Sequence, residues 1–210
     1  MFTGIVQGTS AVTSVSQKPN LTVFVVDLGS RLSKGLNIGA SISVDGVCFT
    51  ATQIDNTLAT FEAIQETLDR STFATIAPGR LVNIERSASA TDEVGGHRVS
   101  GHITGMVNIQ NVHNQENERI LTLNAPDEWI NYVFPKGFIT LDGASLTVVD
   151  VNRQGSVFTV HLIPETLRAT TFANKQEGDR LNFEIDAQTQ TIVDTVERIM
   201  SERAASTPAE

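Results

Sequence analysis

Short runs in which apolar and polar residues alternate dominate the first half of the chain. Such alternation places successive side chains on opposite faces of a strand, so it predicts half-buried β-strands. The runs cover residues 11–15, 21–28, 41–44, 48–54, 59–64 and 81–84. Turn-forming residues separate them, and little helical periodicity interrupts them. Six short strands predict a small closed barrel or sandwich, and closure would remove exposed strand edges.

The second half of the chain repeats the first. The Asp-Gly hairpin at 45–50 returns at 142–147, and the segment 2–8 is echoed at 99–105, both at an offset of 97 positions. Residues 60–68 and 79–85 return at 159–167 and 178–184, an offset of 99. Asp-Gly favours hairpins because it tolerates the positive φ of a tight turn. Four blocks in one order predict a duplicated domain, with two extra residues in the polar loop around 152–155.

The repeat sets the expected domains: an N-terminal barrel with its linker at 1–97 and a C-terminal barrel at 98–187. The linker at 87–96 is small and polar and ends in Gly-Gly, which predicts a flexible or sharply turned crossover. Short helices are expected to open at 66–68 and at 165–167. A final helix at 188–204 and a disordered tail at 205–210 complete the chain.

One face of the expected final helix is apolar, with residues Ile192, Val193, Val196, Ile199 and Met200 at helical spacing. This stripe lies outside both repeats and needs a partner. Two interpretations are open: the helix packs on its own barrels, or it forms a contact between subunits.

Composition and charge exclude several classes of protein. The net charge of −9 argues against a general binder of nucleic acid or anionic membranes, which needs a basic face. No apolar run approaches the ~20 residues of a membrane span, and the first residues lack the basic start of a signal peptide. A single cysteine, Cys48, cannot form an internal disulfide, so we expect the reducing cytoplasm.

The two copies differ at three chemically informative positions. Ile5 of the first copy becomes His102, Cys48 becomes Ser145, and Glu62 becomes His161. No nucleophile elbow surrounds the cysteine or the serine, which argues against a hydrolase. A lone cysteine is often a small buried hydrophobe, and a histidine often binds a backbone carbonyl, so a structural role remains an alternative for both.

Several motifs together resemble riboflavin synthase of the alpha-chain type, over residues 1 to about 200. They are residues 1–6, Gly95-Gly96-His97 leading into Ser100-Gly101-His102, residues 142–148 and residues 163–167. The resemblance implies an all-β protein of two homologous six-stranded antiparallel Greek-key barrels with a C-terminal helix. Each barrel would bind one 6,7-dimethyl-8-ribityllumazine, and three chains would assemble through the helix into a homotrimer.

The resemblance also implies the reaction. A four-carbon unit moves from one lumazine to another, giving riboflavin and 5-amino-6-(D-ribitylamino)uracil without a cofactor or a metal. Lumazine synthase is a candidate partner. A different class is the non-catalytic lumazine- or flavin-binding antenna protein, which shares the duplicated fold. An antenna protein would be expected to lose the catalytic cluster, and His102, Ser145, Thr147 and Cys48 are all present here, which favours the enzyme.

The family pattern assigns catalytic roles. His102 would remove a proton from the C7 methyl group of one lumazine. Cys48 would add to C7 of the other lumazine or position a hydroxide there. Ser145 and Thr147 would bind the ring edge and relay protons, although turn stabilisation alone is a competing role. In the first barrel Ser41 and Thr50 match them.

These roles lead to a division of labour. The C-terminal pocket, with His102, Ser145 and Thr147, would promote proton removal. The N-terminal pocket, with Cys48, Thr50 and Ser41, would present the acceptor.

Substrate contacts are implied along matching stretches of both copies. The ring would pair with backbone groups of Gly4, Ile5, Val6 and of Gly101, His102, Ile103. Glu66-Thr67 and Glu165-Thr166 would contact the ribityl chain or cap a helix start. The complete implied set adds Cys48, Phe49, Thr50, Glu62, Ala63, Ile64, Gln65, Lys136, Ser145, Leu146, Thr147, Leu162, Ile163, Pro164, Leu167 and Asp186.

Some implied contacts are weaker than others. Lys136 and Asp186 match a subunit-shared site, although surface charge is the default for both. The first copy lacks the counterpart of Pro164, which weakens its implied ribityl contacts. His97 lies in the linker, where we expect a structural role.

Overall fold

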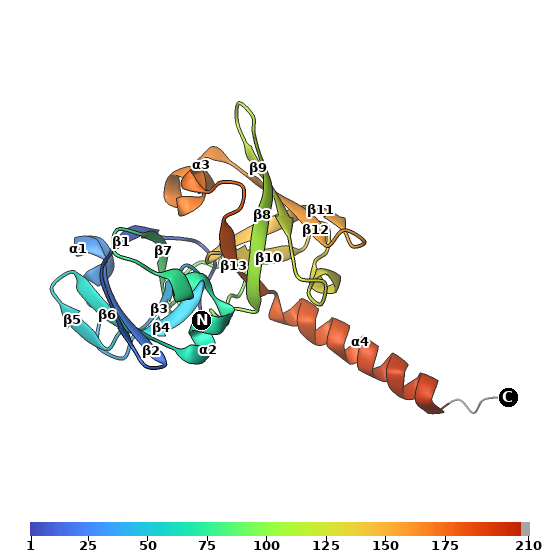
Figure 1. The fold of residues 1–210 in the computed structure, drawn as a ribbon, viewed down its shortest axis with the longest axis horizontal. Helices are drawn as coiled ribbons and strands as arrows, with labels where there is room; N and C mark the ends of the chain where they lie inside the picture. The colour runs from blue at the N-terminus through green and yellow to red at the C-terminus, as the bar shows by residue number, and fades with distance from the viewer. Residues whose placement is uncertain (207–210) are drawn as a thin grey trace.

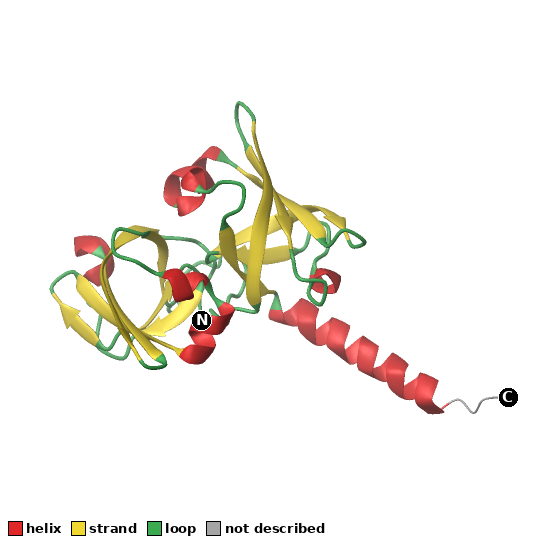
Figure 2. Cartoon of the chain, in the orientation of Figure 1, coloured by secondary structure: helices red, strands yellow, loops and turns green. Residues whose placement is uncertain are grey.

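The computed structural model describes residues 1–206, so residues 207–210 of the expected tail lie outside the described residues. Two β-structures lie side by side, and the helix α4 (Ala187–Ser206) projects from the C-terminal one (Figure 1). Strands make up most of both bodies, as Figure 2 shows in yellow. The observed helix extends two residues beyond the expected end at 204.

The C-terminal half forms the predicted closed six-stranded barrel. Its strands are antiparallel and follow the order β10-β11-β12-β9-β8-β13, with β13 pairing back to β10. The four neighbours β13-β10-β11-β12 have the Greek-key order, in which three consecutive strands are joined by a later strand beside the first. The strands are β8 (Gly105–Asn114), β9 (Arg119–Asn124), β10 (Phe138–Leu141), β11 (Ala144–Asn152), β12 (Val157–Leu162) and β13 (Arg180–Ile185).

The N-terminal half was expected to be a second closed six-stranded barrel, but it is a sheet of the same strand order that is not closed, which we still call the N-terminal barrel. It is a seven-stranded sheet in the order β4-β3-β7-β1-β2-β6-β5. Its two end strands are consecutive pieces of one run, separated only by residues 51–52, whereas the equivalent run in β11 is continuous with an irregular register between Val148 and Val151. The strands are β1 (Gly8–Lys18), β2 (Leu21–Asp27), β3 (Ser41–Val44), β4 (Val47–Thr50), β5 (Gln53–Asp55), β6 (Leu58–Ile64) and β7 (Leu81–Arg86).

Short helices connect the strands. The expected pair is present as α2 (Gln65–Arg70) and α3 (Pro164–Ala169). Each leads into a 3-10 turn, η1 (Thr72–Thr75) or η3 (Thr171–Asn174), whose second amide donates to the hydroxyl of Ser71 or Thr170. Four short elements were not predicted: η1 and η3, together with α1 (Gly29–Ser33) and η2 (Ile130–Tyr132), because so few residues carry no readable period. Within residues 1–206 no helix is long and apolar enough to span a membrane.

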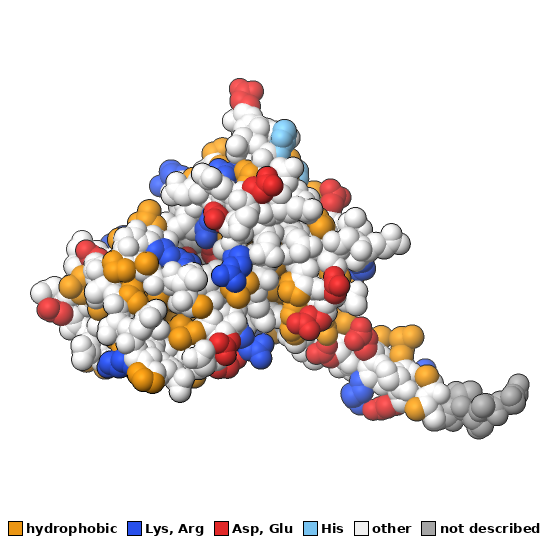
Figure 3. Space-filling model, viewed as in Figure 1, with side chains coloured by type: hydrophobic (Ala, Val, Ile, Leu, Met, Phe, Trp, Pro, Cys, Tyr) orange, Lys and Arg blue, Asp and Glu red, His pale blue; other side chains and the backbone are white. Residues whose placement is uncertain are grey.

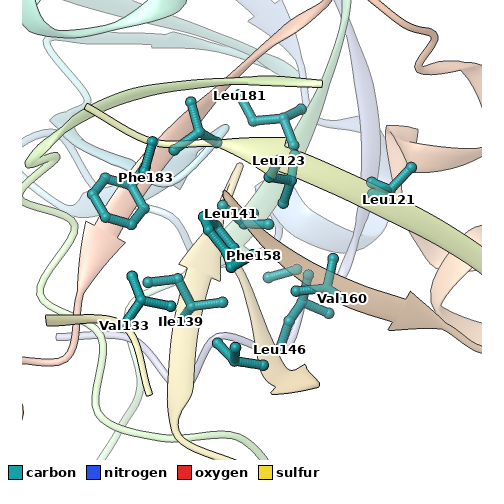
Figure 4. Packing of buried hydrophobic residues seen from close by; sticks show 14 of the residues in the cluster. Leu121, Leu123, Val133, Ile139, Leu141, Leu146, Phe158, Val160, Leu181 and Phe183 are labelled. Atoms are coloured by element: carbon teal, nitrogen blue, oxygen red, sulfur yellow. The ribbon is translucent and has the colours of Figure 1, made fainter. Parts of the chain in front are cut away.

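Each half has its own hydrophobic core. In the N-terminal core the rings of Phe24, Phe49 and Phe73 meet with centroids about 5 Å apart. In the C-terminal core, aliphatic side chains from several strands surround Phe158 (Figure 4). Fully burying such a side chain contributes roughly 1.5–3 kcal/mol, so each barrel is held mainly from within.

A symmetric pair of asparagines braces the two halves. Asn83 of β7 donates from Nδ2 to the backbone oxygen of Asp142, at 2.9 Å, and Asn182 of β13 donates to that of Asp45, at 2.8 Å. All four residues are buried. Because 83 and 182 are equivalent positions of the repeat, the halves face each other about an approximate twofold axis.

Candidate active site

The beginning of each repeat packs on the opposite barrel. We call residues 4–6 and 101–103 the crossing segments. The amide of Ser145 in β11 donates to the backbone oxygen of Gly4, at 2.8 Å, and the amide of Cys48 in β4 donates to that of Gly101, at 2.9 Å. Val6 belongs to the C-terminal core, while Ile103 packs against the N-terminal one. Each half of the site is therefore built from both repeats.

Glycine is required where the crossing segments touch the strands. Gly4 and Gly101 have φ values of +74° and +82°, in the region that residues with a Cβ rarely adopt. A Cβ at Gly4 would lie 2.5 Å from the Cβ of Ser145, and one at Gly101 would lie 2.6 Å from the Cβ of Cys48. Only an unsubstituted backbone can approach the two candidate reactive side chains this closely.

Two buried glutamates anchor the crossing segments. Glu85 accepts hydrogen bonds from the amide and hydroxyl of Thr3, at 2.6 and 2.7 Å, and from the amide of Gly4 at 3.1 Å. Glu184 accepts the matching bonds from Ser100, at 2.7 and 2.8 Å, and from Gly101 at 2.9 Å. Burial raises the pKa of both carboxyls, and these hydrogen bonds oppose the rise.

Sequence reasoning missed these glutamates, although a signal was present. Both copies carry a charged residue at an inward position of an apolar strand, in the repeated block that ends at 85 and 184. A carboxylate at such a position needs several hydrogen-bond donors to compensate its burial.

The first cavity, which we call the Cys48 pocket, has a volume of about 250 Å³. It brings together predicted residues from both repeats: Cys48 from β4, the exposed His102 from the crossing segment, and Glu66 and Thr67 from α2. Arg70, which the sequence analysis did not select, also lines it and pairs with Glu66 at 2.6 Å. The remaining lining residues are Val47, Ser71, Gly101 and Ile103.

This arrangement corrects the expected division between the pockets. His102 was expected to share the C-terminal pocket with Ser145 and Thr147, but the structure places it beside Cys48. The reason is the exchange of crossing segments between the barrels, which sends Ile5 to the Ser145 side and His102 to the Cys48 side. Strand patterns alone carry no information about this exchange.

A second and larger cavity, the central cavity, adjoins the first and has a volume of about 750 Å³. That size is typical of a small-molecule site. Cys48 and His102 line both cavities, and Asp186, at the start of α4, lines this one. Other lining residues are Met1, Val94, Gly96, His97, Arg98, Val99, Ser100, Phe138, Ala187 and Gln188.

The linker places a second histidine in this cavity. His97 is buried, and its Nδ1 lies 2.7 Å from the hydroxyl of Ser145. Its Nε2 lies 3.2 Å from the hydroxyl of Thr140, and its ring stacks on Phe138 with centroids 4.9 Å apart. Burial lowers the pKa of His97, and the charge of Asp186 opposes this. We expected only a structural role here, because no sequence pattern links the linker to β11.

The remaining predicted residues fall into three groups. Ser41 and Thr50 are direct cross-strand partners on β3 and β4, and Thr147 occupies the equivalent position to Thr50 on β11. The side chains of four predicted contacts face the cores, so only their backbone is available to a ligand: Phe49, Ala63, Leu146 and Leu162. The exposed or half-buried members are Ile5, Glu62, Ile64, Gln65, Lys136, Ile163, Pro164, Glu165, Thr166 and Leu167.

Two charged candidates have partners within the chain. Glu165 pairs with Arg168 on α3, which lowers the pKa of the carboxyl. His161, which replaces Glu62 in the repeat, lies 2.8 Å from Glu118.

Among residues 1–206, no three His, Cys, Asp or Glu side chains gather in a way that could hold a metal ion.

The chain matches the lumazine binding domain family twice, over residues 3–87 and 100–186. It is 44% identical over 204 residues to the riboflavin synthase of Escherichia coli (strain K12), covering 97% of this chain and 95% of that protein. It is 36% identical over 206 residues to the riboflavin synthase of Chlamydia muridarum (strain MoPn / Nigg), covering 97% and 98%.

Solved structures give the same fold. LumP in complex with riboflavin superimposes with a TM-score of 0.82, covering 89% of this chain and all of LumP, at 19% sequence identity. LumP in complex with 6,7-dimethyl-8-(1'-D-ribityl) lumazine gives a TM-score of 0.80, also at 19% identity. At this identity the likeness establishes the fold alone.

Proposed function

The chain belongs to the riboflavin synthase family, and from this premise we propose that it converts two molecules of 6,7-dimethyl-8-ribityllumazine into riboflavin and 5-amino-6-(D-ribitylamino)uracil. A four-carbon unit passes from one lumazine to the other, without a cofactor. Binding two identical substrates requires two related sites, and the duplicated barrels with exchanged crossing segments provide them. Holding both substrates in place can lower the barrier by roughly 7–11 kcal/mol.

The observation that carries the proposal is the meeting of Cys48 and His102 in one pocket. His102 is exposed to this cavity, as a group that exchanges protons with a bound ligand must be. Cys48 lines both cavities, and in the proposed reaction it would add to C7 of a lumazine or position a hydroxide there. An antenna protein that only holds a fluorophore has no need of this pair.

Ribityl recognition is assigned to α2 in the first site and to α3 in the second. Glu66 and Thr67 line the Cys48 pocket, and a carboxylate and a hydroxyl are suited to a chain of hydroxyl groups. Arg70 adds donors to the same wall, whereas the equivalent position of the second copy is Ala169. The second copy carries its arginine one position earlier on α3, where Arg168 pairs with Glu165 as Arg70 pairs with Glu66 on α2.

Incubation of the protein with 6,7-dimethyl-8-ribityllumazine tests the function. We expect riboflavin absorbance to appear with one riboflavin formed per two lumazines consumed. His102→Gln should lower turnover at least 100-fold, the typical contribution of a positioned acid or base, while the variant still quenches riboflavin fluorescence. Tight binding without turnover by the wild type would establish the antenna protein instead.

We also propose that three chains assemble through α4 and that each catalytic site pairs the N-terminal barrel of one chain with the C-terminal barrel of a neighbour. Most of the stripe on α4 is exposed in the single chain: Ile192 is 64% exposed and Met200 is 67% exposed. The apolar surface along the helix (Figure 3) therefore needs a cover that its own barrels do not supply. The cytoplasm is the proposed compartment, and lumazine synthase is a candidate partner.

Subunit exchange between two inactive variants tests the shared site. Cys48 and His102 lie in the same pocket, so the two lesions must be Cys48→Ala and Ser145→Ala, one in each barrel. Sites shared between chains would place both lesions in one site and leave another intact, so activity should partly return. Sites formed within one chain would each keep a lesion, and continued inactivity after demonstrated exchange would exclude sharing.

A further inference from the structure

A histidine from the linker bridges two hydroxyl groups on neighbouring strands. Thr140 of β10 and Ser145 of β11 are direct cross-strand partners. The two ring nitrogens of His97 lie 2.7 Å from Ser145 Oγ and 3.2 Å from Thr140 Oγ1. The ring cannot turn freely, because it stacks on Phe138 at an interplanar angle of 14° and is only 7% exposed. The imidazole therefore meets both hydroxyls at once in a single orientation.

The hydrogen-bonding roles follow from the chemistry of a neutral imidazole, in which one nitrogen donates and the other accepts. Burial favours the neutral ring, since it lowers the pKa of His97. The shorter contact, at Nδ1, is the one to Ser145. We assign Nδ1 as the acceptor of the Ser145 hydroxyl proton and Nε2–H as the donor to Thr140. The lone pairs of Ser145 Oγ then remain available to a ligand.

The other barrel has a different arrangement at the equivalent positions. There the cross-strand pair is Ser43 and Cys48, and the histidine that shares a cavity with Cys48 is His102. One stretch of chain, residues 97–102, thus supplies one histidine to each candidate reactive side chain. The linker that joins the barrels is therefore part of the site.

We propose that His97 is a positioning residue for Ser145: it fixes the direction of the serine hydroxyl and thereby sets how the second lumazine is held for reaction. The proposal rests on the proposed function for the identity of the ligand. The geometry of the three side chains does not depend on it.

Paired amide substitutions separate the two ring nitrogens. His97→Asn places its amide near the position of Nδ1 and keeps a partner for Ser145, whereas His97→Gln reaches toward Nε2 and keeps a partner for Thr140. We expect kcat to fall roughly 10-fold or more in His97→Gln, the effect of losing one hydrogen bond in a site that depends on it. His97→Asn should stay within about 3-fold of the wild type. A folded His97→Gln with normal kcat would overturn the proposal.

A double-mutant cycle distinguishes positioning from structural support. If His97 acts through Ser145, then His97→Gln should add little to the loss already caused by Ser145→Ala. Independent, additive losses would show that the histidine does not act through the serine. His113 on β8 lines neither cavity, so His113→Gln serves as the matched control and should leave kcat unchanged.

A measurement on the wild type keeps the proposal testable if the variants fail to fold. Imidazole 15N chemical shifts should show His97 as the Nε2–H tautomer, and Ser145→Ala should shift the Nδ1 resonance. The opposite tautomer, or no response to Ser145→Ala, would overturn the assignment. If the wild type produces no riboflavin, the proposed function fails while the tautomer and its response still decide the positioning role.

Discussion

At the scale of a single residue, Gly101 allows the crossing segment 101–103 to approach Cys48 closely. Gly101→Ala would place its Cβ 2.6 Å from the Cβ of Cys48 at a φ of +82°. The left-handed backbone costs about 1–2 kcal/mol, and the clash adds about 1–3 kcal/mol. We therefore expect a loss of roughly 2–5 kcal/mol in the free energy of unfolding, measured by urea titration, together with weaker riboflavin binding.

The matched control for this substitution is Gly79→Ala. Gly79 has a φ of +86°, but nothing lies within 4 Å of its Cβ position. The Gly79→Ala variant should lose only the backbone contribution to the free energy of unfolding, about 1–2 kcal/mol, and should bind riboflavin normally. Equal losses at the two positions would show that the close approach to Cys48 has no energetic consequence.

His97 should also leave a signature in the dependence of stability on pH. Its pKa is lowered in the folded protein, so the unfolded chain binds the proton more readily. The stability from the neutral ring is then complete above the ordinary value of 6.5 and is lost as pH falls through the lowered pKa. His97→Phe keeps an aromatic ring for the stack on Phe138 and removes the titration.

Unfolding titrations between about pH 7.5 and pH 5 measure this effect, since they span the ordinary histidine pKa. The wild type should lose stability relative to His97→Phe as the pH falls. Asp186, Arg98 and His102 line the same cavity, so their charges are common to both proteins and cancel in the difference. A difference that stays constant with pH would show that His97 does not titrate in this range.

At the scale of an element, helix α4 exposes apolar side chains that the proposed trimer would cover. Tyr132 donates a hydrogen bond to Asp194 of this helix, at 2.5 Å, while Val196 and Ile199 are 49% and 39% exposed. Val196→Glu combined with Ile199→Glu should convert a trimer into monomers, because each apolar side chain covered at the contact contributes about 1.5–3 kcal/mol.

Sedimentation measures this dissociation, and circular dichroism should show both barrels still folded. Ser201→Glu, on the opposite face of α4, is the control and should leave the trimer intact. If the wild type sediments as a monomer at working concentration, the proposed role of α4 in assembly is excluded.

The exchange of crossing segments has a consequence at the scale of the whole molecule. The expected N-terminal domain, residues 1–97, lacks the segment 101–103 that completes the Cys48 pocket. Its own segment 4–6 would in turn have lost Ser145 as a partner. Since the halves are related by an approximate twofold axis, the segment 4–6 of one fragment can pack on Cys48 of a second.

We therefore expect fragment 1–97 to form a homodimer that binds riboflavin, with Ile5 in the position of His102 and hence little catalytic activity. Sedimentation and fluorescence quenching measure the two properties. The same fragment with Gly4→Ala should fail at both, because a Cβ at this residue would collide with the facing strand. A monomeric fragment that binds riboflavin normally would contradict the role assigned to the crossing segments.

Much of the architecture is determined by the sequence alone. The alternation of apolar and polar residues predicts the strands, the Asp-Gly turns predict the hairpins, and the internal repeat predicts two similar barrels. These features are local, because the pleat of a strand and the φ of a turn depend on neighbouring residues. The apolar stripe of α4 and the candidate reactive residues Cys48, His102 and Ser145 are visible at the same level.

The tertiary structure decided which of these residues meet. Cys48 shares a cavity with His102 because the crossing segments exchange barrels, and His97 reaches Ser145 because the linker folds back between the halves. Glu85 and Glu184 hold the exchanged segments over more than 80 residues of intervening chain. Such contacts depend on how two finished barrels dock, and the local pattern of a strand is the same whichever barrel its neighbour comes from.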